Sequence, residues 1–168
     1  IAGQGAALSQ LQALAARLGL GARVRFLGFV PNEDLPALLN SIDIFAMPSD
    51  AELLSIATLE AMACGRPILA ANARALPELV SPGLNGYLFR PGDAEDAAQH
   101  MALLADQPAK WAEMGTASAR RAEAHYLENT ILSYEALYES LLAGIPFAMR
   151  LPEKARAPSS QRQPRVET

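Results

Sequence analysis

The chain of 168 residues contains one cysteine and two histidines, and aromatic residues make up only 6% of it. Because Cys64 has no second cysteine to pair with, an internal disulfide is excluded, which fits a reducing cytosol. His100 and His125 have no second ligand at metal-binding spacing, so we interpret both as structural or exposed. The 14 Lys and Arg against 18 Asp and Glu give a formal charge of −4, which argues against a nucleic-acid-binding surface.

The sequence also lacks a run of about 18 apolar residues and a signal-peptide pattern, so no membrane-spanning helix or secretory leader is expected. A cytoplasmic protein is the expectation. The first residue is Ile1 rather than Met, within what reads as a strand, so we expect the chain to be part of a longer protein. Its length and its 51% of hydrophobic residues suffice for one domain with a substantial core.

Strand and helix patterns alternate from Ile1 to Phe89, which predicts an α/β fold with a parallel sheet and helices on both faces. Expected strands cover 1–5, 23–30, 42–47, 67–71 and the end of 83–89, and expected helices cover 6–18, 33–41, 94–105, 109–126 and 128–143. On the helix over 94–105, the expected core stripe is Ala97, Met101 and Leu104. Apolar and aromatic residues at helical spacing in the last two helices are expected in the core or in inter-domain packing: Trp111, Met114, Ile131, Tyr134, Leu137, Tyr138 and Leu141.

The composition changes near residue 144. Four prolines and several Arg, Ser and Gln follow, without apolar periodicity. We therefore expect a folded domain over 1–143 and a Pro/Arg-rich, disordered tail over 144–168. The mildly basic tail would allow weak peripheral contact with the inner face of an anionic membrane, and a solvated terminus is the alternative.

The stretch from Met47 to Ala70 carries two carboxylates, Glu52 and Glu60, with seven residues between them. It reads as a strand end, a polar loop, a short helix and a second buried strand. Glu52 is expected in the loop or at the very start of the helix, and Glu60 about two turns later. Ser49 or Ser55 would cap the helix, and Gly65 followed by Pro67 would end it. A helix that opens at the carboxyl end of a parallel strand directs free N–H groups towards a crevice suited to phosphate.

A simpler interpretation of the same stretch stays open at this point. Ser49 to Glu52 also fits a capping box, and Glu60 could point to solvent from a surface helix.

The detailed string distinguishes the two. Pro48-Ser49-x-x-Glu52, followed by Leu59-Glu60-Ala61-Met62-Ala63-x-Gly65-x-Pro67, closely resembles the retaining nucleotide-sugar glycosyltransferases of family 4, which have the GT-B fold. The string from Gly83 to Asp93 also matches that family, as scaffold, and Pro91-Gly92-Asp93 is expected to cap the helix over 94–105. The resemblance covers about residues 1–143. It implies the C-terminal, donor-binding, Rossmann-like half of a GT-B fold, here without its first strands, followed by C-terminal helices.

The resemblance also implies roles for particular residues. Glu60 would accept hydrogen bonds from the ribose hydroxyls of the donor, because a carboxylate offers two acceptor oxygens to a diol. Glu52 would lie near the donor sugar as the catalytic carboxylate. The backbone N–H groups of Leu53, Leu54 and Ser55 would hold diphosphate or sugar oxygens. Leu54-Ser55 replaces the Phe-Gly usual in the family, which retains backbone contacts but not a side-chain contact.

Further donor contacts implied by the resemblance come from the first 30 residues. Gly3 and Gly5 would form a Gly-x-Gly turn beside the donor, although a plain strand-to-helix turn explains them as well. Phe29 and Val30 would lie under the nucleotide base, or simply end a strand.

One departure concerns the turn after the strand over 67–71. The family commonly has a Gly-rich turn there, whereas this chain has Asn72 and Ala73. Arg74 follows, and it could be a phosphate ligand or an unconstrained surface arginine.

The function implied for the whole protein is transfer of a hexose, with retention of anomeric configuration, from a UDP- or GDP-sugar to a lipid, polysaccharide or small-molecule acceptor, without metal or other cofactor. An N-terminal acceptor domain and a basic phosphate clamp would precede these residues, so the chain alone is expected to be inactive. The alternatives are a non-catalytic nucleotide-sugar-binding module, a GT-B-like nucleotide-sugar epimerase and a dinucleotide-binding domain. The last is disfavoured because Gly3-Gln4-Gly5 lacks the third glycine and the later acidic residue.

Overall fold

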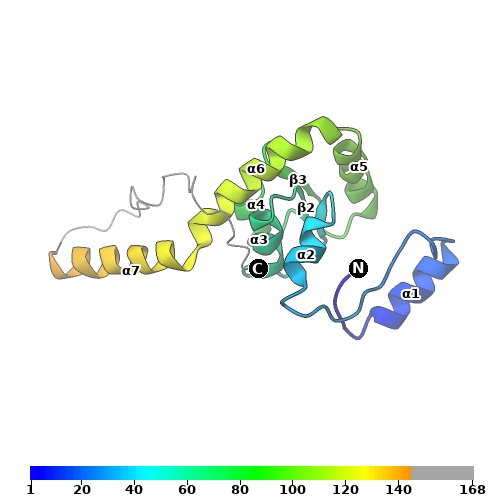
Figure 1. The fold of residues 1–168 in the computed structure, drawn as a ribbon, viewed down its shortest axis with the longest axis horizontal. Helices are drawn as coiled ribbons and strands as arrows, with labels where there is room; N and C mark the ends of the chain where they lie inside the picture. Colours follow the sequence, from blue (N-terminus) through cyan, green and yellow to red (C-terminus); the bar gives the residue numbers. More distant parts are fainter. Residues whose placement is uncertain (145–168) are drawn as a thin grey trace, which may run out of the picture. The chain divides into compact units, whose positions relative to one another are not determined.

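The computed structural model describes residues 1–144. The described residues fall into two units, Ile1–Ser41 and a second that begins at Ile42. Figure 1 shows their helices and strands. Apart from Gly144, the tail expected over 144–168 lies outside the described residues.

The first unit contains two helices, α1 (Leu8–Arg17) and α2 (Leu35–Asn40). The expected α1 boundaries of 6–18 and α2 boundaries of 33–41 were each one or two residues too wide. In α2, Leu39 is buried at 6% exposure, whereas α1 contains no buried residue. Leu11 and Leu14 on α1 are 41% and 39% exposed.

The two strands expected in this unit, over 1–5 and 23–30, are reduced to one parallel bridge between Ala2 and Gly28. The Gly3 N–H donates to the Gly28 carbonyl at 2.7 Å, and the Leu27 N–H donates to the Ile1 carbonyl at 2.8 Å. The ladder stops there because Gly3 (φ +117°) and Gly28 (φ +66°) leave the extended conformation that a strand requires. The prediction of a buried strand over 1–5 is wrong, since residues 1–5 are exposed.

The second unit is built on a parallel three-stranded sheet of β1 (Phe45–Met47), β2 (Ile68–Ala71) and β3 (Gly86–Phe89), in the order β1-β2-β3. All four residues of β2 are buried. A central strand covered on both faces needs such a continuous apolar sequence, so the prediction for 67–71 is confirmed. β1 is an edge strand of this sheet and is only partly buried, which corrects the expectation of a buried strand there.

Helices lie on both sides of the sheet, as expected for a Rossmann-like α/β fold. Along the chain these elements are α3 (Ile56–Ala63), α4 (Leu76–Leu79), α5 (Ala94–Ala105), η1 (Pro108–Lys110), α6 (Trp111–Ala122), η2 (Glu123–His125) and α7 (Leu127–Leu142). α3 contacts β1 and β2, α5 contacts β2 and β3, and α6 packs against α3. The core between them contains Met62, Ile68, Leu69, Leu76, Leu79, Leu104 and Met114, each at most 2% exposed.

Two helix ends form as their residues predict. Asp93 is the N-cap of α5, and its side chain accepts a hydrogen bond from the Asp96 N–H at 2.9 Å. Gly65 ends α3 in the left-handed conformation (φ +68°), and the Arg66 N–H bonds back to the Ala61 carbonyl at 3.0 Å. These two caps fix where the helices α5 and α3 begin and end.

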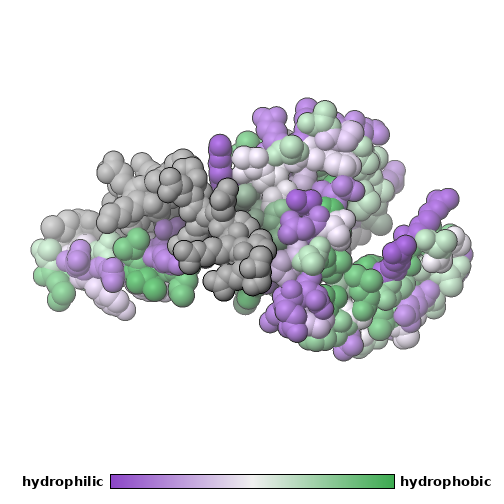
Figure 2. Space-filling model, viewed as in Figure 1, coloured by the Kyte–Doolittle hydropathy of each residue, from purple (hydrophilic) through white to green (hydrophobic). Residues whose placement is uncertain are grey.

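Several expected core positions are exposed instead. Met101 on α5 is 48% exposed. On α7, which contains no buried residue, Tyr134 and Tyr138 are 57% and 61% exposed. Ile131 and Leu141 on the same helix are 48% and 64% exposed. Figure 2 shows hydrophobic surface, in green, along α7. The prediction that these α7 residues pack in the core is therefore wrong within residues 1–144. Their inter-domain packing stays a prediction.

Candidate functional site

Glu52 lies in the loop between β1 and α3, four residues before the helix begins. Its backbone carbonyl accepts a hydrogen bond from the Ala75 N–H at 3.3 Å, which ties this loop to the turn that follows β2. Because β1 and β2 are parallel neighbours, both turns leave the same carboxyl edge of the sheet. Of the two expected positions for Glu52, the loop is correct and the helix start is wrong.

The capping-box interpretation of this loop does not hold. The Ser49 hydroxyl accepts a 3.4 Å hydrogen bond from the Ala51 N–H, but no helix follows directly. Ser49 therefore closes a local turn within the loop.

Ser55 occupies the N-cap position of α3, with extended backbone angles and a buried side chain. Its hydroxyl does not accept from a helix N–H, as a capping side chain would, but accepts a 2.9 Å hydrogen bond from the Thr58 hydroxyl. Both side chains are fully buried, so this pair fixes the first turn of α3 from the inside. Ser55 is thus the cap by position, while its side chain has a partner that the sequence did not predict.

The helix starts later than expected, which corrects the placement of Leu53, Leu54 and Ser55. These residues precede α3, and the first intrahelical bond joins the Leu59 N–H to the Ser55 carbonyl. Leu53 is 91% exposed and Leu54 is 53% exposed. Within residues 1–144, their N–H groups and that of Ser55 have no hydrogen-bond partner. The helix N–H groups free at this end begin at Ile56, so the N–H groups without a partner extend over the loop and the first helical turn.

Glu60 is in α3 and its side chain is exposed. It lies four residues after Ile56, about 6 Å further along the helix axis. The buried side of α3 is formed by Thr58, Ala61 and Met62, so the carboxylate projects from the opposite, solvent-accessible side. The Glu60 carboxylate is therefore accessible to a ligand and does not take part in core packing.

In the first unit, the structure brings together the segments that were expected to contact the donor. The Ala2–Gly28 bridge sets Gly3 beside the segment leading into Phe29 and Val30. Phe29 is 68% exposed, and the space around the Cα atoms of Gly3 and Gly5 is open. These four residues thus present an accessible surface within the first unit, and their contact with a donor stays a prediction.

The thiol of Cys64, at the end of α3, has a raised pKa because partial burial disfavours the thiolate. Arg66 donates from Nε to the Cys64 carbonyl at 2.9 Å and from a terminal nitrogen to the Ile42 carbonyl at 2.8 Å. The guanidinium therefore joins the end of α3 to the segment entering β1. Sequence reasoning did not identify Arg66, because nothing in the linear pattern marks which backbone carbonyls it meets.

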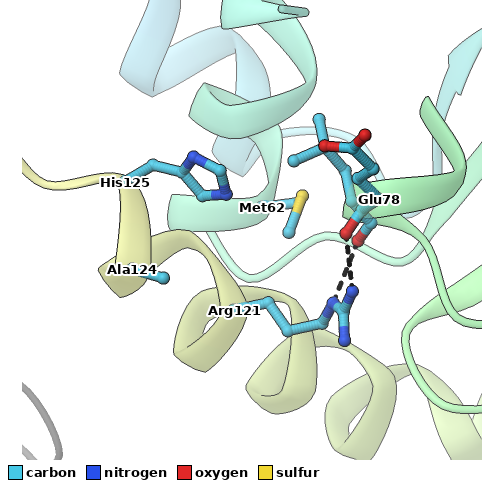
Figure 3. Close-up of a pocket in the computed structure, with 6 residues that line it drawn as sticks. Met62, Glu78, Arg121, Ala124 and His125 are labelled. Carbon is cyan, nitrogen blue, oxygen red and sulfur yellow. Dashed lines mark hydrogen bonds between the residues drawn. The ribbon is translucent and has the colours of Figure 1, made fainter. Parts of the chain in front are cut away.

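An open hollow of about 230 Å³ lies elsewhere in the second unit (Figure 3). Its lining is Met62, Glu78, Leu79, Arg121, Ala124 and His125, and none of these is a predicted site residue. Arg121 donates to the Leu79 carbonyl at 3.1 Å and to the Glu78 carbonyl at 2.7 Å. Its guanidinium thus caps the last carbonyls of α4, which is a structural task.

No group of three or more His, Cys, Asp or Glu within residues 1–144 is arranged to hold a metal ion. None of the helices over the same residues has the length and hydropathy needed to cross a bilayer.

The comparisons with known proteins agree with this geometry. A family model described as glycosyl transferases group 1 matches residues 1–121. The chain belongs to this family.

Individual relatives of this glycosyltransferase chain differ in their named activities. It is 41% identical over 113 residues to a D-inositol 3-phosphate glycosyltransferase of Streptomyces avermitilis, covering 67% of this chain and 24% of that protein. It is 39% identical over 94 residues to an O-antigen chain mannosyltransferase B of Escherichia coli, covering 56% of this chain and 24% of that protein. The chain therefore spans about a quarter of the length of these curated relatives.

Solved structures of glycosyltransferases share the fold. Sucrose-phosphate synthase from Thermosynechococcus elongatus superposes with a TM-score of 0.74 at 30% identity, over 83% of this chain and 35% of that chain. Anabaena HepE, solved in complex with UDP-glucose, gives a TM-score of 0.71 at 32% identity, over 84% of this chain and 40% of that chain. The expectation of a Rossmann-like α/β domain of GT-B type is confirmed.

Proposed function

We propose that this chain forms the donor-binding part of a retaining, family 4 glycosyltransferase that transfers a hexose from a UDP- or GDP-sugar. The observation that carries the proposal is the accessible segment from Glu52 to Glu60 at the carboxyl edge of the parallel sheet. Two carboxylates and a run of backbone N–H groups without partners in residues 1–144 lie within nine residues of sequence there. Ligands of open α/β sheets bind at this edge.

The chemistry of the segment suits the parts of a nucleotide sugar. The N–H groups of Leu53, Leu54, Ser55 and Ile56 offer fixed donors to a diphosphate, whose negative charge grows as it departs. Glu60 accepts hydrogen bonds from the ribose hydroxyls. Glu52 binds hydroxyls of the donor sugar and stabilises positive charge that develops on the ring.

The relatives support the donor class but differ in the sugar. HepE was solved with UDP-glucose, whereas the Escherichia coli relative is named a mannosyltransferase. HepE supports a nucleotide-sugar donor, and the two names leave the sugar open, so UDP and GDP sugars are both retained. Gly3 and Gly5 would approach the donor through the backbone, and Phe29 and Val30 would contact the base.

The remaining parts of the reaction are assigned to sequence beyond this chain. The acceptor, a lipid, polysaccharide or small molecule, would bind in an N-terminal domain, and the chain alone would be inactive. The whole protein would act in the cytoplasm, with peripheral membrane contact if its acceptor is a lipid. No metal or other cofactor is invoked, so transfer should persist in EDTA.

Calorimetric titration of the protein expressed from its complete gene, with UDP- and GDP-hexoses, tests the donor site. Saturable heat with one nucleotide series is expected. Absence of heat with every nucleoside diphosphate sugar would overturn the proposal.

The reaction products distinguish the proposed transferase from the alternative functions. A binding module would bind the sugar nucleotide without turnover, and an epimerase would change the sugar without an acceptor. A retaining transferase instead yields the nucleoside diphosphate and a glycoside with the anomeric configuration of the donor, which NMR coupling constants report.

A further inference from the structure

Arg74 is the one residue other than glycine within residues 1–144 that has a positive φ, +53°. In this left-handed region the Cβ of an L-residue crowds the following carbonyl, which glycine avoids. Arg74 therefore holds a conformation that is unfavourable for its own side chain. Non-glycine residues in such conformations gather at functional sites, where the surrounding structure imposes them.

The hydrogen bonds on either side of Arg74 show what imposes its left-handed backbone conformation. The Ala73 N–H donates to the Ala71 carbonyl at 2.8 Å at the end of β2, and the Leu76 N–H donates to the Ala73 carbonyl at 3.1 Å where α4 starts. Between them, the Ala75 N–H is directed to the Glu52 carbonyl. The reversal from β2 into α4 is thus completed at residue 74, directly beside the loop that carries Glu52.

The side chain of Arg74 is exposed and makes no ion pair or hydrogen bond within residues 1–144. The other arginines near turns of this unit are occupied. Arg66 and Arg121 each bind two backbone carbonyls, and Arg90 pairs with Asp93 at 3.0 Å. Arg74 therefore adds a planar, permanently charged donor to the edge of the sheet where Glu52 lies.

We propose that Arg74 is a further donor-binding residue, whose guanidinium binds an anionic oxygen group of the donor. This inference rests on the proposed function, because it takes the loop of Glu52 as the donor site. The anionic group is either the diphosphate or a carboxylate on the sugar, and guanidinium recognises both through paired N–H donors. The nearby Glu52 would bind hydroxyls, so the two side chains would select different parts of one ligand.

The test compares Arg74→Gly, Arg74→Gln and Arg74→Lys with wild type in calorimetric titrations with UDP, UDP-glucose and UDP-glucuronate. Loss of hydrogen bonds to a charged group raises Kd about tenfold to a hundredfold. We expect Arg74→Gly and Arg74→Gln to show this loss, and Arg74→Lys to recover part of it. If the diphosphate is the partner, all three ligands weaken together; if a sugar carboxylate is the partner, only UDP-glucuronate weakens.

Two controls keep the outcomes distinct. Arg120→Gln removes an exposed charge from α6 and should leave every Kd unchanged, so a general charge effect is separated from a local one. Arg74→Gly should also raise Tm, because glycine relieves the strained φ, which shows that weaker binding does not arise from unfolding. Wild-type affinity in all Arg74 variants would overturn this inference alone. Failure of wild type to bind any UDP- or GDP-hexose would overturn the proposed function as well.

Discussion

Gly65 and Gly115 lie backbone to backbone where α3 packs against α6. A Cβ atom built on Gly115 would be 2.1 Å from the Gly65 carbonyl oxygen, far inside any tolerated contact. The close approach brings α6 onto the helix that carries Glu60, and it places Met114, at 2% exposure, in the core. The position of α3, and therefore of the candidate site, depends on this contact.

Gly115→Ala should accordingly destabilise the protein by at least about 2 kcal/mol, because the backbone of Gly65 cannot move without shifting α3. Urea unfolding measures the change. Thr116→Ala is the matched control, since its side chain is exposed on the same helix and should alter stability by less than about 0.5 kcal/mol. Equal stability of Gly115→Ala and Thr116→Ala would contradict the packing described.

The N-cap of α5 is a second point where one side chain decides local structure. Removing the Asp93 carboxylate leaves the Asp96 N–H without its 2.9 Å acceptor, and we expect Asp93→Ala to cost about 1 kcal/mol. Glu95→Ala, in the same first turn, removes a charge but no cap and should cost less. Thermal unfolding of the two variants compares them directly, and an equal loss would argue against the cap.

Lowering the pH should reveal the contribution of Asp96 to the stability of the fold. Its pKa is lowered, first because the Arg90 N–H donates to its carboxylate at 2.7 Å, and further by the charges of Arg90 and His100. A lowered folded-state pKa means that the stabilisation is present above the ordinary value of 3.8 and is lost as pH falls through the lower folded value. The difference in unfolding free energy between wild type and Asp96→Asn should shrink below that pH. A difference that stays constant from pH 5 to pH 2 would contradict the assignment.

Cys64 should react slowly with alkylating reagents. Because burial raises its pKa above 9.0, the thiolate fraction at pH 8 is smaller than for a free cysteine. The rate with iodoacetamide should rise with pH to a midpoint above 9, and should return to that of an ordinary thiol in denaturant. A midpoint below 9 in the folded protein would show that Arg66, rather than burial, dominates.

Substitutions of Glu52 and Glu60, the two carboxylates of the candidate site, should affect different kinetic parameters. Glu60→Ala would remove the proposed ribose contacts and is expected to raise the donor KM about tenfold or more. Glu52→Ala is expected chiefly to lower kcat, because charge on the sugar ring develops in the transition state. Steady-state kinetics of the complete protein measure both parameters. Wild-type values for both variants would show that the role assignment is wrong.

Local signals in the sequence determined much of the second unit. Asp93, Gly65 and the apolar run 67–71 predicted a helix start, a helix end and a buried strand, and all three formed. They succeed because a cap, a left-handed glycine and a continuous apolar strand each act through neighbouring residues. The family string from Pro48 to Pro67 likewise indicated a glycosyltransferase.

Other features required the folded chain. The exposure of Tyr134 and Tyr138 could not be read from helical spacing, because an apolar stripe is the same whether or not a partner covers it. The strand expected over 23–30 is reduced to one bridge, because Gly3 and Gly28 both have positive φ angles. The sequence alone does not show that these two glycines lie opposite each other.

The sequence by itself therefore determined the residue types of the candidate site and their order along the chain. Only tertiary structure decided that the Glu52 carbonyl meets the Ala75 N–H, that Ser55 binds Thr58 and that Arg74 completes the turn beside them. The physical reason is that a hydrogen bond between distant segments depends on the path of the whole backbone, whereas a cap or a periodic pattern depends on a few consecutive residues.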